Sequence, residues 1–74
     1  MSADPPPTPP PEATVVVLAY NSERFMQGCL DALHRTRGVA LEVVCVDNAS
    51  RDASHQIAES HPATSLAIRL EKNL

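Results

Sequence analysis

The chain has 74 residues, six basic and nine acidic residues for a net charge of −3, and only two aromatic residues, Tyr20 and Phe25. This length allows one small domain at most, and without a basic stripe or several aromatics for base stacking we expect no nucleic-acid partner. No apolar run approaches the ~20 residues of a membrane-spanning helix, and the first residues lack the basic start and apolar core of a signal peptide, so we expect no membrane span.

Six prolines lie near the beginning of the chain, between Met1 and Ala13. Proline fixes φ and lacks an amide donor, so this segment favours an extended polyproline II conformation and cannot join a sheet. We therefore predict a disordered leader over residues 1–13 and a folded unit over residues 14–74. Docking of the leader on an SH3-like groove is an alternative that the lack of flanking basic residues disfavours.

The first predicted strand runs from Thr14 to Ala19, where a β-branched run shows no polar alternation. Such a run is typical of a parallel strand that is covered on both faces. After it, apolar residues recur at three and four positions, which predicts an amphipathic helix of about fourteen residues. We expect Asn21 or Ser22 to cap this helix and Gly38 to follow its end. Its apolar stripe consists of Phe25, Met26, Cys29, Leu30 and Leu33.

The second predicted strand runs from Leu41 to Val46 and ends in residues that favour turns. A second helix is expected to start near Asp52 or Ser54 and to end before Pro62, because the residue before proline disfavours helix. Residues 65–70 alternate and predict a third strand with one more exposed face. The order is β-α-β-α-β, an α/β unit of three parallel strands whose right-handed crossovers place both helices on one face.

Polar residues follow the first two strands at the point where each strand ends. Parallel sheets present ligand-binding groups at this carboxyl edge, so we expect ligand chemistry at Tyr20, Asn21, Asp47 and Asn48. A dinucleotide-binding loop and a phosphate-binding loop are both excluded, because the chain has only two glycines and neither glycine-rich motif.

The cysteines and histidines give no metal signal. Cys29 and Cys45 do not form a Cys-x-x-Cys pair and each lies in an apolar segment, so we expect buried, reduced thiols in a cytoplasmic chain. The three histidines, His34, His55 and His61, show no zinc-like spacing with them, and we assign no metal site.

Three strings in these positions resemble the amino-terminal third of the family-2 glycosyltransferases, which are inverting enzymes of the Rossmann-like GT-A fold. They are Val15–Asn21, Cys29–Leu33, and Val46–Ser50 continued by Asp52–Ser54, with Glu71, Lys72 and Asn73 after the third strand. The resemblance covers residues 14–74. It implies a truncated, partial GT-A unit that transfers a sugar from a nucleotide-diphosphate sugar to an acceptor hydroxyl when complete.

The resemblance also implies a nucleotide-binding role for five residues. Ala19 corresponds to a backbone contact, Tyr20 to the wall that stacks on a pyrimidine, and Glu23 to a polar rim. Asp47 and Asn48 correspond to partners of the base and ribose. The expected donor is a UDP- or dTDP-sugar, although Asn48 stands where many members have a second acid, and an amide donates as well as accepts hydrogen bonds.

The catalytic parts that the resemblance implies are missing from the sequence. Family members hold a divalent metal, Mg or Mn, with an Asp-x-Asp motif and use a later carboxylate as general base, and neither is present, so we assign no catalytic residue and no cofactor to this chain. We expect it to be inactive by itself; the alternative is a non-catalytic nucleotide-binding or interaction module left by gene truncation. Without the rest of a domain, we expect it either to be loosely ordered or to self-associate through the first strand.

Overall fold

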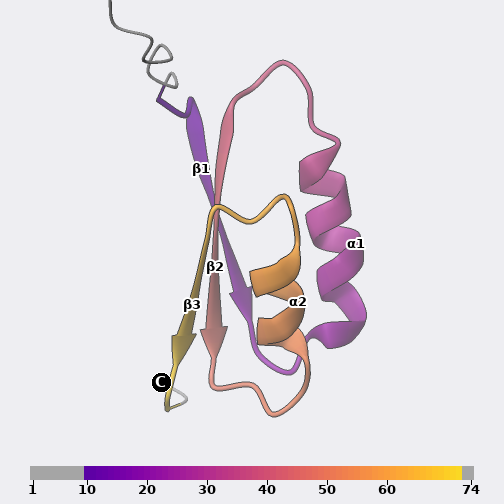
Figure 1. Cartoon of the computed structure of the whole chain (residues 1–74), viewed down its shortest axis with the longest axis vertical. Coiled ribbons are helices and arrows are strands. Elements are labelled where there is room, and N and C mark those ends of the chain that lie inside the picture. Colours follow the sequence, from indigo (N-terminus) through magenta and orange to yellow (C-terminus); the bar gives the residue numbers. More distant parts are fainter. Residues whose placement is uncertain (1–9, 73–74) are drawn as a thin grey trace, which may run out of the picture.

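The computed structural model describes residues 10–72, which form an α/β unit with the predicted order of elements (Figure 1). These elements are β1 (Ala13–Ala19), α1 (Glu23–His34), β2 (Leu41–Asn48), α2 (Ser54–Ser60) and β3 (Leu66–Leu70). Most of the predicted proline-rich leader, and Asn73 of the family resemblance, lie outside the described residues. No helix within residues 10–72 is long and apolar enough to cross a membrane.

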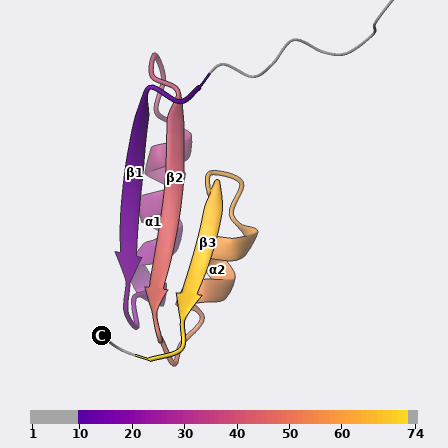
Figure 2. The same cartoon turned by 90° about the vertical axis from the view of Figure 1, so that its left-hand side faces the viewer.

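The three strands form one parallel sheet in the order β1-β2-β3. Val15 pairs with Val43 and Val44 pairs with Leu66, so the long central strand β2 holds both neighbours. Both helices cover the same face of this sheet, as right-handed crossovers in one direction require (Figures 1 and 2). The predicted fold class is therefore confirmed.

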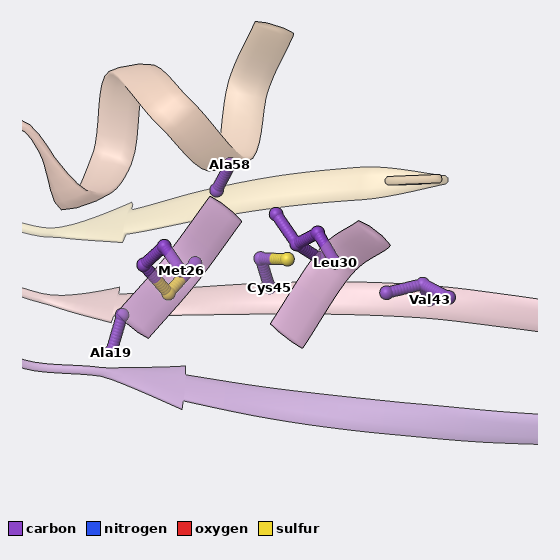
Figure 3. Close-up of a cluster of buried hydrophobic side chains, with 6 residues drawn as sticks. All are labelled: Ala19, Met26, Leu30, Val43, Cys45 and Ala58. Carbon is purple, nitrogen blue, oxygen red and sulfur yellow. The ribbon is translucent and has the colours of Figure 1, made fainter. Parts of the chain in front are cut away.

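The core lies between the helices and the sheet. Leu30 is fully buried, and Met26, one turn earlier in α1, is 2% exposed. Figure 3 shows Leu30 near Cys45 of β2 and Met26 nearer the arrowhead ends of the strands, beside Ala19; β2 also contributes its alternate residue Val43. Ala19 from β1 and Ala58 from α2 complete the cluster of buried apolar residues.

Two residues of the predicted apolar stripe on α1 are exposed. Phe25 is 72% exposed, and Cys29, predicted to be a buried thiol, is also exposed, whereas Cys45 is buried as expected. A helix on a flat sheet buries only a narrow arc, and here that arc passes through Met26 and Leu30. Phe25 and Cys29 lie on the flank of this arc. Both cysteines are free.

The face of the sheet opposite the helices is apolar and has no helix against it among the described residues (Figure 2). We call it the open face. Alternation and register define it by two rows of three residues, namely Val16, Val44 and Leu66, and Leu18, Val46 and Ile68. Leu18 is 75% exposed and Val16 is 59% exposed, so the prediction that the first strand is covered on both faces was wrong for these residues. The cause is the placement of both helices on the other face.

One buried histidine ties α1 to the segment after α2. The side chain of His61 is 4% exposed, and its Nε2 lies 2.7 Å from Oδ1 of Asp31 on α1. Because the amide of Ala63 donates to Nδ1 of His61, the ring proton lies on Nε2 and is donated to Asp31. This hydrogen bond is the largest cause of a lowered pKa of Asp31.

We expect the contribution of Asp31 to stability to depend on pH. A carboxyl whose pKa is lower in the folded state stabilises the fold above its ordinary value of 3.8, and this gain is lost as pH falls through the folded pKa. Urea unfolding of Asp31→Asn should thus show a lower midpoint than wild type at pH 7, with the difference shrinking as pH falls below about 4. A difference that persists unchanged at pH 2.5 would contradict this, and Glu71→Gln, which removes an exposed acid, should change little at either pH.

Candidate functional site

Two loops meet at the carboxyl edge of the sheet, where the strand arrows end in Figure 2. The first follows β1 and begins with Tyr20, and the second follows β2 and begins with Ala49. Each contains one residue in the left-handed region, Asn21 with φ of 49° and Ala49 with φ of 56°. Asparagine tolerates this conformation better than alanine does, so Ala49 is held there against its own preference.

The two loops hold each other by hydrogen bonds that run in both directions. The amide of Asn21 donates to Oγ of Ser50 at 2.9 Å, and the amide of Ser22 donates to Oγ of Ser54 at 2.7 Å. In return, the amide of Arg51 donates to Oδ1 of Asn21 at 2.9 Å. These bonds join residues about thirty positions apart in the sequence, so the geometry of each loop depends on the presence of the other.

The carboxylate of Asp52 binds the starts of both helices. Its Oδ2 accepts the amide of Glu23, the first residue of α1, and its Oδ1 accepts the amide and hydroxyl of Ser54, the first residue of α2. The hydroxyl of Ser54 is the largest cause of a lowered pKa of Asp52. Glu23 makes a reciprocal bond to the second loop, because its Oε2 accepts the amide of Ala53.

These hydrogen bonds show that the predicted capping of α1 by Asn21 or Ser22 was wrong. Ser22 occupies the N-cap position, but its hydroxyl bonds to the backbone of Tyr20 and not to the helix. The first amide of α1 is instead satisfied by Asp52 from the other loop. The Asp52 carboxylate already occupies this helix start, so in the described residues it is not open to a phosphate group in the way that helix termini of dinucleotide-binding folds are.

Three of the five residues predicted to bind nucleotide line one hollow of about 220 Å³ at this edge. They are Ala19, Tyr20 and Asn48, and the remaining lining residues, Leu18, Val46 and Leu70, are apolar. Tyr20 is 53% exposed, so its ring is accessible to a planar ligand. Apolar walls with a few polar groups are what a nucleoside pocket needs.

The other two predicted residues, Asp47 and Glu23, lie elsewhere. Asp47 is adjacent to Asn48 in β2, so the two side chains point to opposite faces of the sheet. Asp47 is 1% exposed on the helix side, where its Oδ2 accepts the amide of Ser50 and its Oδ1 has no partner among the described residues. Glu23 is exposed and tied to the second loop by Ala53. Neither Asp47 nor Glu23 lines the hollow.

A second hollow of about 630 Å³ shares Leu70 with the first and contains two arginines that sequence reasoning missed. Arg51 lies in the loop after β2, and Arg69, near the end of β3, pairs in register with Asp47. The guanidinium of Arg69 donates to the carbonyl of Ser50 at 3.4 Å. The only sequence signal for this pair was a basic residue in each segment at the carboxyl edge. No group of three or more His, Cys, Asp or Glu side chains in residues 10–72 could hold a metal ion.

Comparison with known proteins gives consistent similarities. Residues 14–74 match the sequence model of a family described as Glycosyl transferase family 2. An uncharacterized glycosyltransferase of Bacillus subtilis, EpsJ, is 32% identical over 60 residues, which are 81% of this chain and 17% of EpsJ. A second protein of that bacterium, named Putative glycosyltransferase EpsH, is 33% identical over 51 residues, 69% of this chain and 15% of EpsH. The chain thus spans about one sixth of the length of these relatives.

A solved structure shows that the similarity extends to the backbone. It is the mannosyltransferase PcManGT from Pyrobaculum calidifontis in complex with GDP-Man and Mn2+. This structure is similar over 95% of the present chain and 22% of its own, with a TM-score of 0.69 and 32% sequence identity. The unit of three strands and two helices is therefore a portion of a longer fold in that protein.

Proposed function

The chain belongs to glycosyl transferase family 2, and from that membership we propose that the hollow lined by Ala19, Tyr20 and Asn48 binds the nucleoside part of a nucleotide sugar. The observation that supports this most directly is the hollow itself, which joins an accessible aromatic ring and an amide at the carboxyl edge of a parallel sheet. The mannosyltransferase with a similar backbone was solved with GDP-Man, a ligand of the proposed class.

We propose a uridine or thymidine diphosphate sugar as the donor, with GDP-mannose as the competing candidate. A pyrimidine can stack on Tyr20, and the Asn48 amide can both donate to and accept from its imide edge. The ligand of the similar mannosyltransferase favours guanine instead. Binding of UDP and of GDP to this chain distinguishes the two donors.

We further propose that sugar transfer requires residues beyond these 74. The chain contains no Asp-x-Asp motif, and its described residues do not form a group that fits a divalent metal. The much longer relatives have room for these parts. The contribution of this chain is then to bind and orient the nucleoside, and the free cysteines are consistent with a cytoplasmic location.

Tyr20→Ala is expected to weaken binding of the preferred nucleotide by about 5- to 150-fold, because stacking of a base on an aromatic ring contributes about 1–3 kcal/mol. Titration of the purified chain with UDP and with GDP, followed by NMR or calorimetry, measures this effect. The matched control is Phe25→Ala, which removes the other aromatic ring from an exposed position outside the hollow.

The control variant should bind as wild type does. Equal affinities for wild type and Tyr20→Ala would refute the assignment of the hollow, and equal losses in the two variants would point to a general effect on folding. If neither UDP nor GDP binds the wild-type chain, the proposed function of this portion fails.

A further inference from the structure

Tyr20 and Asn48, which line the hollow, are each followed directly by a left-handed residue. A non-glycine residue in this region is strained, alanine more than asparagine, and persists only where surrounding contacts fix it. Here the contacts come from the opposite loop, because Asn21 binds Ser50 and Arg51. The turn that places Tyr20 at the hollow therefore depends on the loop that follows Asn48, and the reverse also holds.

Asp52 stands at the centre of this mutual dependence. Among the described residues it is the carboxylate that binds the first amides of both helices, α1 through Glu23 and α2 through Ser54. Ser54, which is fully buried, extends the chain of bonds to the amide of Ser22. Asp52 itself lines neither the first nor the second hollow, so any influence it has on a bound nucleotide must act through the loops.

We propose that Asp52 is a positioning residue for the nucleotide site: its carboxylate couples the two loops, and the alignment of Tyr20 with Asn48 depends on it. The coupling follows from the hydrogen bonds alone, whereas the effect on a ligand rests on the proposed function. Asp52→Asn tests it with little change in size, because one of the two acceptor oxygens becomes an NH2 group that faces a backbone or hydroxyl donor.

Asp31→Asn is a matched control that the chain itself offers. Asp31 is the same residue type, has a lowered pKa for the same kind of reason, and likewise ties α1 to a distant segment by a side-chain hydrogen bond. His61, the partner of Asp31, follows the end of α2. Asp52 precedes the start of α2, at the carboxyl edge of the sheet. The two variants thus perturb similar bonds in different places.

The first measurement is amide hydrogen exchange of the full chain without ligand. In Asp52→Asn, exchange at Asn21, Ser22 and Arg51 should accelerate about fivefold, since a helix-capping bond is lost at both loops. In Asp31→Asn these amides should exchange as in wild type. If only Glu23 and Ser54 respond to Asp52→Asn, Asp52 is a local cap and the proposal is overturned.

The second measurement is titration with UDP and with GDP. Asp52→Asn should bind the preferred nucleotide about fivefold or more weakly per folded molecule, while Asp31→Asn should bind it as wild type does. Equal affinities for Asp52→Asn and wild type would overturn the positioning role. A wild-type chain that binds neither nucleotide would refute the proposed function, and hydrogen exchange would still decide the coupling. If Asp52→Asn does not fold, Ser54→Ala removes the hydroxyl that joins Asp52 to the amide of Ser22, and it is held to the same outcomes for exchange at Asn21 and Arg51 and for nucleotide affinity.

Discussion

Leu30→Ala is expected to lower the free energy of unfolding by about 2–5 kcal/mol. Leu30 is fully buried and lies over β2 among Met26, Val43 and Cys45 (Figure 3), so its truncation leaves a cavity that this small core cannot easily refill. A single core in a chain of this size rarely supplies more than about 3–5 kcal/mol. We therefore expect the cooperative unfolding transition of the variant to be nearly or completely lost in urea or thermal melts followed by circular dichroism.

The matched control for Leu30→Ala is Leu18→Ala, the same substitution on the open face. Leu18 is 75% exposed, so its removal should change the free energy of unfolding by no more than about 0.5 kcal/mol. Similar losses in both variants would show that something covers the open face in solution. A small loss in Leu30→Ala alone would contradict the placement of the core.

Val16→Lys is expected to convert self-associated chains into monomers. β1 is an edge of the described sheet, and its seven residues, Ala13–Ala19, include no charge and no proline. Such an edge is a template for pairing with another strand, and natural proteins block edges of this kind with charged side chains, especially lysine. The other edge, β3, has five residues and carries Arg69, so it is a poorer template.

Sedimentation velocity at several concentrations measures this association. Phe25→Lys is the matched control, because it introduces the same charge at an exposed apolar residue that lies on α1. We expect this control to remain associated like wild type. Monomeric wild-type chain at high micromolar concentration would contradict the prediction. Dissociation of both variants would show that the added charge, and not its place on β1, prevents self-association.

The sequence predicted the element order and the parallel sheet, because those signals are local, and three of the five residues expected to bind nucleotide line the hollow. β-branched runs, helical spacing and the polar residues that follow each strand are all visible within a few positions of the chain. The same reasoning failed for Phe25, Cys29, Val16 and Leu18, which are apolar but exposed. An apolar pattern shows which side chains favour burial, but it does not show whether a neighbouring element is present to bury them.

Two further predictions were wrong for different reasons: the residue that caps α1, and the placement of Asp47 and Asn48 together at one site. Asp52 is 29 positions from the amide that it satisfies, so no local motif predicts the bond. In contrast, the opposite directions of Asp47 and Asn48 were predictable, because the alternation of β2 continues through both residues. The predicted end of this strand at Val46 concealed that signal.

The parallel sheet also has a consequence for synthesis of the chain on the ribosome. Partners in β1 and β2 stand 28 positions apart, and partners in β2 and β3 stand 22 apart, so no hairpin can form early. At about 5–20 residues per second, β1 waits roughly 1–6 s before its partner has been translated. During that interval an uncharged apolar strand is unpaired on both edges, so the nascent chain is most vulnerable to aggregation and to capture by chaperones before β2 emerges.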